Sequence, residues 1–189
     1  MEITREEAFN LLKEYVDSKS LLKHCLAVEA SMRGYAEKFG EDIEVWSSCG
    51  LLHDIDFEKY PDDHPFKGAE ILKEKGYPED FVMAVKGHAD YTNTPRETQM
   101  AKTLYAVDEL SSFVIACVLV RPNKFEGLKV KSVKKKLKDK AFAKAVDRDQ
   151  IKNSAQELGI ELTEHIQTVI DALVKREKEL KEQGLSLIE

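Results

Sequence analysis

Apolar residues recur at the three- and four-residue spacing of one helical face along almost the whole chain, and the alternation typical of β-strands is hard to find. The N-terminal segment shows the pattern well. Thr4 and Glu7 stand at the two ends of a capping box, and the apolar positions that follow it are Ala8, Leu11, Leu12, Tyr15 and Val16. This spacing predicts a first helix near residues 4–17.

Further helices are predicted from periodicity together with capping and breaking residues. Ser20 is a candidate N-cap for the second helix, which Gly40 would end, and Asp147 is a candidate N-cap near the C-terminus. Residues 56–65 contain two prolines and four acidic residues, which predicts a loop. The predicted helices after the first cover residues 20–39, 43–53, 66–75, 79–89, 97–120, 132–137, a short piece near Phe142, 147–158 and 161–180.

Composition places the chain among soluble globular proteins. With 189 residues, the chain is long enough for one good core and short for two. We therefore expect an all-α fold of roughly eight to ten helices in a single domain that spans residues 1–189. No run approaches the roughly 20 apolar residues that a membrane span needs, and residues 1–7 lack the pattern of a signal peptide.

Charge and cysteine usage narrow the function classes. The net charge of −6 argues against general nucleic-acid or anionic-membrane binding over the whole surface. The three cysteines are far apart and form no C-x-x-C pair, so neither a disulfide framework nor a thiolate zinc site is supported. We expect a cytoplasmic protein with no membrane partner.

Four of the five histidines and two aspartates lie on or beside predicted helices, in an order that metal chemistry would explain. They are His24, His53, Asp54, His64, His88 and Asp108. Neighbouring helical residues point about 100° apart, so the pair at 53 and 54 can reach one ion only near a helix end. The loop at 56–65 provides such an end.

Each of these residues also has an ordinary structural explanation. A lone histidine on an apolar helix face, such as His24, is more often a hydrogen-bonded core residue than a ligand. A histidine-aspartate pair recurs by chance in many proteins. The alternative for Asp108 is a solvent-exposed position on a helix face. The metal hypothesis therefore depends on the six residues occurring together in this order. His165, on the polar side of the last predicted helix, is expected to be exposed and not a ligand.

In this order the residues resemble the HD superfamily of metal-dependent phosphohydrolases, whose pattern is a histidine, a histidine-aspartate doublet and a distal aspartate on a helical frame. The string Leu52-His53-Asp54-Ile55 looks like the doublet of the HDIG subgroup, although Asp56 stands where that subgroup has glycine. The strings His64-Pro65 and Gly68-Ala69-Glu70-Ile71-Leu72 are similar to those that follow the doublet in dinuclear members. The G-Y-P segment of cyclic-dinucleotide phosphodiesterases does not follow Gly87-His88, so that substrate is not assigned.

The resemblance implies an HD-type helical fold around a metal site, with a core at about residues 20–112 and a helical extension at about 130–181. It implies that His24, His53, Asp54 and Asp108 hold one ion, and that Asp54 bridges to a second ion held by His64 and His88. Mixed histidine and carboxylate ligation favours one or two ions of Mn, Fe, Co or Ni over Mg or Zn. His53 and Asp54 are then the expected catalytic residues, in hydrolysis of a phosphate ester by metal-activated water.

Substrate contacts are predicted from the positive charge. A lysine-rich run at 129–140 lies in an acidic protein, and we expect Arg121 and Lys134 to contact phosphate, while the other lysines form a solvated helix face. The expected partner is a small phosphorylated substrate, and a nucleotide is the expected class. Two alternatives stay open: a nucleotide-binding sensor with little turnover, and a nucleic-acid-binding protein that uses residues 129–140.

Overall fold

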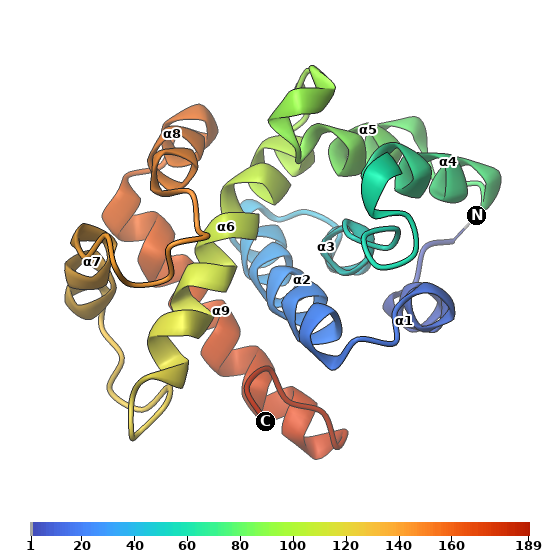
Figure 1. Ribbon diagram of the computed structural model, residues 1–189. Helices are drawn as coiled ribbons and strands as arrows, with labels where there is room; N and C mark the ends of the chain where they lie inside the picture. Colours follow the sequence, from blue (N-terminus) through green and yellow to red (C-terminus); the bar gives the residue numbers. More distant parts are fainter. Residues whose placement is uncertain (1) are drawn as a thin grey trace.

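The computed structural model describes residues 2–189, and this part of the chain contains nine α-helices, two short 3-10 helices and no strand (Figure 1). The prediction of an all-α fold with eight to ten helices is therefore confirmed. The α-helices are α1 (Arg5–Tyr15), α2 (Lys19–Phe39), α3 (Ile43–Leu52), α4 (Phe66–Glu74), α5 (Glu79–Gly87), α6 (Gln99–Leu119), α7 (Val130–Lys138), α8 (Arg148–Leu158) and α9 (Leu162–Glu182). The 3-10 helices are η1 (Pro61–Asp63) and η2 (Asp90–Thr92). No described helix combines the length and apolar composition of a membrane span.

Most helix starts follow the capping residues in the sequence. The Thr4 hydroxyl accepts a hydrogen bond from the amide of Glu7 at 3.3 Å, as the capping box predicts. Asp147 caps α8, and its carboxylate accepts from the amides of residues 149 and 150. The predicted cap of the second helix was wrong, because Ser18 and not Ser20 caps α2, accepting from the amide of Leu21 at 3.3 Å.

The helix predicted near Phe142 was also wrong, because this segment forms turns between α7 and α8. Its carbonyl groups are satisfied by a side chain instead of a helical ladder. The Arg148 guanidinium donates to the carbonyls of Leu137, Asp139, Phe142, Ala143 and Val146. A single arginine thus supplies the donors that a short helix would have provided.

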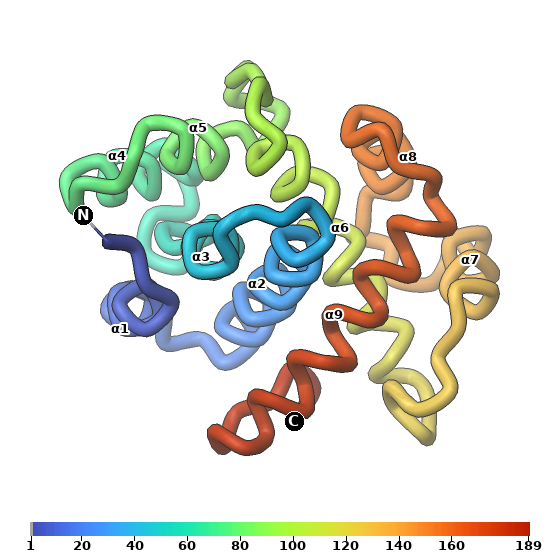
Figure 2. Tube along the Cα trace, turned by 180° about the vertical axis from the view of Figure 1, so that it is seen from behind, coloured from blue at the N-terminus to red at the C-terminus, as the bar shows by residue number. Residues whose placement is uncertain are grey.

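The two long helices α2 and α6 pack together in the centre of the fold. Helices α1, α3, α4 and α5 lie on one side of this pair, and α7 and α8 lie on the other (Figure 1). Seen from behind, α9 runs beside both central helices (Figure 2). This arrangement surrounds the middle of α2 and α6 with other helices and buries their apolar residues.

A glycine sets the distance between α3 and α2. A Cβ atom at Gly50 would lie 2.9 Å from the Val28 carbonyl oxygen and 2.8 Å from Cγ of Met32. Only glycine therefore allows the two helices to approach this closely. The contact brings the C-terminal end of α3, which His53 follows, against the middle of α2. His24 lies on the same helix α2, nearer its N-terminus.

Candidate metal centre

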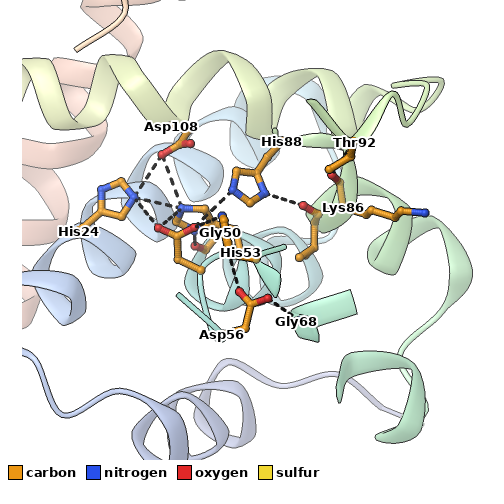
Figure 3. Close-up of polar contacts among 12 residues, drawn as sticks. His24, Gly50, His53, Asp56, Gly68, Lys86, His88, Thr92 and Asp108 are labelled. Atoms are coloured by element: carbon orange, nitrogen blue, oxygen red, sulfur yellow. Dashed lines mark hydrogen bonds and ion pairs between the residues drawn. The ribbon is translucent and has the colours of Figure 1, made fainter. Parts of the chain in front are cut away.

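The six metal-competent residues predicted from the sequence come together at one place in the fold. They come from five segments: α2 supplies His24, the end of α3 supplies His53 and Asp54, the loop after it supplies His64, the end of α5 supplies His88, and α6 supplies Asp108. The labelled members point toward one another in Figure 3. The side chains of two groups, His24 with His53 and Asp108, and His53 with Asp54 and His88, are close enough to hold a metal ion.

The doublet reaches the cluster because α3 ends there. His53 is the C-cap of α3, and the chain turns directly after it. The backbone turn lets both His53 and Asp54 face the same interior point, which a continued helix would not allow. The helix end expected at this position is present in the structure.

Asp54 has a different set of histidines on each of its two oxygens. Its Oδ2 lies 3.3 Å from Nε2 of His24 and 3.4 Å from Nε2 of His53. Its Oδ1 lies 3.3 Å from Nε2 of His88 and 3.5 Å from Nε2 of His64. The carboxylate therefore stands between two groups of nitrogen atoms.

Asp108 completes the group on the Oδ2 side. Its Oδ1 lies 3.2 Å from Nε2 of His24 and 3.5 Å from Nε2 of His53, and the two histidine Nε2 atoms are 3.1 Å apart. Four potential ligand atoms thus surround one point on this side, from residues 24, 53, 54 and 108.

Three of the histidines have their ring orientation fixed from behind. Nδ1 of His53 donates to the Gly50 carbonyl at 2.7 Å, and Nδ1 of His88 donates to the Val85 carbonyl at 2.5 Å. Nδ1 of His64 donates to the Asp56 carboxylate at 2.7 Å. Because these oxygens only accept, the hydrogen of each neutral ring is on Nδ1, and the lone pair on Nε2 faces the cluster.

Lone pairs that face carboxylates repel them unless a positive charge lies between. This donor set, with imidazole nitrogens and carboxylate oxygens converging and the far nitrogens hydrogen-bonded, is the arrangement that metal-binding histidines show in proteins. These residues therefore form a suitable ligand set for a divalent transition ion, whose charge would remove the repulsion between the nitrogen lone pairs and the carboxylates.

Protonation can supply the same positive charge when no cation does so. Burial lowers the pKa of His24, but hydrogen bonds to Asp108 and Asp54 outweigh it and raise the pKa to about 9. Burial acts against His53 as well, yet the charges of Asp54 and Asp108 hold its pKa well above the usual range. The pKa of Asp54 is lowered by the same histidines despite its burial. A metal ion that binds here would displace these protons.

Asp56 holds one of the clustered histidines in place, a contact that was not predicted from the sequence. Its side chain is fully buried, and its two oxygens accept from Nδ1 of His64 at 2.7 Å and from the amide of Gly68 at 2.6 Å. A Cβ atom at Gly68 would lie only 3.0–3.1 Å from this carboxylate. The sequence signal was the aspartate in place of the HDIG glycine, and the structure uses it to join the loop, His64 and the start of α4.

Arg121 and Lys134 are not brought to this cluster. The Arg121 guanidinium donates to the carbonyls of Lys124 and Glu126 in its own loop, and the Lys134 amine contacts the Thr163 hydroxyl. No contact described for residues 2–189 joins either side chain to the six residues. Their assignment as phosphate contacts stays a prediction.

His165 was predicted to be exposed, and this was wrong. The ring is fully buried, with Nδ1 2.5 Å from the Tyr35 hydroxyl and Nε2 donating to the Ala106 carbonyl at 2.9 Å. Burial lowers its pKa to about 4, so the ring is neutral. His165 is a hydrogen-bonded core residue that links α9 to α2 and α6, and it lies outside the metal-competent groups.

Comparison with known proteins agrees with this geometry. The family model of the HD domain matches residues 21–112, so this part of the chain belongs to the HD superfamily. The match begins in α2 and ends in α6, and it includes all six clustered residues. HD domains are a family of metal-dependent phosphohydrolases, and the histidine and aspartate cluster could hold a metal ion.

Two relatives match this chain over segments of similar length. An uncharacterized protein of Methanocaldococcus jannaschii is 33% identical over 89 residues, which cover 44% of this chain and 52% of that protein. Ribonuclease Y of Rhodopirellula baltica is 36% identical over 77 residues, which cover 39% of this chain and 15% of the ribonuclease. The chain thus spans about half of the first relative's length and a much smaller part of the second.

Proposed function

We propose that this chain is a phosphohydrolase with a dinuclear metal centre that acts on the phosphate ester of a nucleotide. The observation that carries the proposal is the position of Asp54, whose Oδ2 faces His24 and His53 and whose Oδ1 faces His64 and His88. A carboxylate that has histidine nitrogen atoms near each of its two oxygens is suited to bridge two cations.

In this proposal His24, His53, Asp54 and Asp108 hold one divalent ion, and Asp54, His64 and His88 hold the other. Bound cations there would lower the pKa of water and neutralise phosphate oxygens. Imidazole with carboxylate favours Mn²⁺, Fe²⁺, Co²⁺ or Ni²⁺. The protein fixes the ring orientations through the Nδ1 contacts, which removes the cost of ordering the ligands when an ion binds.

Substrate has access from the side of the first ion. The side chains of His24 and Asp108 keep 22% and 17% of their surface exposed, whereas His53 is fully covered. A phosphate group can therefore approach across His24 and Asp108. A nucleotide is favoured among phosphate esters because one relative carries the name ribonuclease Y.

The proposal is tested with protein loaded with Mn²⁺ and assayed against a panel of nucleoside monophosphates, dinucleotides and aryl phosphate diesters. Asp54→Asn keeps the size of the side chain but removes the bridging charge, so turnover and metal content should be lost together. Asp63→Asn is the matched control, because Asp63 is an exposed carboxylate in the same loop region.

Two results would contradict the proposal. Turnover that survives Asp54→Asn would remove Asp54 from the reaction. Nucleotide binding without turnover by any metal-loaded form would favour the alternative of a nucleotide sensor.

A further inference from the structure

A pocket of about 350 Å³ lies directly beside the candidate metal centre, between α2, α6 and the C-terminal residues. His24 is the member of the six-residue cluster that lines it, next to Ser112, and its larger apolar lining residues are Ile115, Leu119, Leu187 and Ile188. Small-molecule sites in proteins are mostly apolar clefts of about 300–1,000 Å³ with a few placed polar groups. This pocket has the size and composition of such a site.

The C-terminal wall of the pocket is held firmly in place. After α9 the chain folds back (Figure 1), and Glu177 accepts hydrogen bonds from the amide of Leu187 and the hydroxyl of Ser186, each at 2.7 Å. Leu187 is 1% exposed, and its neighbour Ile188 is half-buried. The wall therefore belongs to the fold, although it lies outside the segment that matches the HD domain.

Ser112 supplies a polar group between the metal centre and the pocket. Its hydroxyl lies 3.0 Å from Nδ1 of His24. If Nε2 of His24 binds a cation, its hydrogen is on Nδ1 and donates to the serine oxygen. The serine hydroxyl then has its own hydrogen to donate to an acceptor atom of a ligand.

Leu119 stands at the edge of the pocket with 46% of its surface exposed, which leaves apolar area for a ligand to cover. Lys23 is the one lysine or arginine among the described residues that line the pocket. A single cation suits a ligand with one phosphate, whereas a nucleic-acid strand would need several.

We propose that this pocket binds the base and sugar of a mononucleotide whose phosphate lies at the metal centre. The apolar side chains of Ile115, Leu119 and Ile188 cover the base, and the Ser112 hydroxyl donates to an oxygen of the sugar or the ester. The inference rests on the proposed function for the position of the phosphate. It assigns substrate selection to helix α6 and to a C-terminal segment outside the HD match.

The test compares ligands that differ only in the base. The four common ribonucleoside 5′-monophosphates and ribose 5-phosphate are titrated into Mn²⁺-loaded protein, and Kd is measured by calorimetry, or KM where a ligand is turned over. The nucleotides should bind roughly tenfold more tightly than ribose 5-phosphate. Leu119→Asp should remove most of this preference while the affinity for ribose 5-phosphate and the metal content stay unchanged.

Val120→Asp is the matched control, because Val120 is the next residue, is 60% exposed and lines a different pocket. Ile115→Trp fills the pocket instead of charging it and should give the same loss as Leu119→Asp. Circular dichroism confirms that each variant is folded.

The outcomes separate the two proposals. Equal binding of nucleotides and ribose 5-phosphate, no binding of either, or a base preference that Leu119→Asp and Ile115→Trp leave intact would overturn the pocket assignment. Hydrolysis of no phosphate ester by the wild-type protein would refute the proposed function, but the base preference in binding would still be measured.

Discussion

Replacing Asp56 by asparagine should selectively weaken the binding of one metal ion, the one that His64 would hold. The Asp56 carboxylate accepts two hydrogen bonds at once, from Nδ1 of His64 and from the amide of Gly68. An asparagine of the same shape has only one accepting oxygen, and its NH₂ group would face the remaining N–H donor. The side chain cannot move aside easily, because it is fully buried and in close contact with Gly68.

The magnitude follows from these two contacts. Loss of a hydrogen bond that orients a metal-binding histidine typically costs about 10–100-fold in metal affinity. If the amide of Gly68 loses its acceptor instead, the unsatisfied buried group costs about 1–3 kcal/mol of stability. His24, His53 and Asp108 make no described contact with Asp56, so the ion that they hold should bind with unchanged affinity.

The assay is calorimetric titration of metal-free protein with Mn²⁺, which resolves the two binding steps. Asp56→Asn should weaken one step by about 10–100-fold and leave the other within about twofold. Asp63→Asn, the same substitution at an exposed position of the neighbouring segment, should change neither step. Equal weakening of both steps, or of neither, would refute the role assigned to Asp56.

Two further predictions concern the stability of the fold. His165 has a pKa of about 4 in the fold and 6.5 in the unfolded chain, so the unfolded state takes up a proton first as the pH falls. The contribution of the neutral His165 to the free energy of unfolding should therefore be fully present above pH 6.5 and fall by about 3 kcal/mol as the pH drops toward 4. Urea titrations should show that His165→Gln lacks this pH-dependent loss. Glu29 is fully buried between Arg5 and Arg176, at 2.9 and 2.7 Å, so Glu29→Ala should cost about 3–5 kcal/mol. Glu37→Ala, which removes an exposed ion pair, should cost less than about 1 kcal/mol, and equal losses would contradict this account of Glu29.

The sequence was sufficient to predict most helices, because their signals are local. Apolar spacing, the capping residues Thr4 and Asp147, and the prolines of the 56–65 loop all act within a few positions along the chain. Ser18 and Ser20 are both good caps, and local chemistry does not separate them. The segment near Phe142 has a helical pattern, but Arg148 satisfies its carbonyl groups, and that contact exists only in the folded chain.

The clustered residues could be predicted because all six occur together in an order that resembles the HD superfamily pattern, although no one of them is a specific signal alone. The surroundings of a histidine in the fold could not be predicted in the same way. His165 occupies a polar position in the periodicity of its own helix, yet it is buried because Tyr35 and Ala106 from other helices provide its partners. The pocket wall at Leu187 depends on a chain reversal after α9, for which periodicity holds no signal.

The central claim is that the six side chains hold two cations with Asp54 between them. Elemental analysis of protein purified without chelators and without a histidine tag tests this most directly. We expect about two transition ions per chain in the wild type and about one in His64→Ala. No bound metal after incubation with Mn²⁺ or Fe²⁺, or one ion that His64→Ala leaves unchanged, would contradict it.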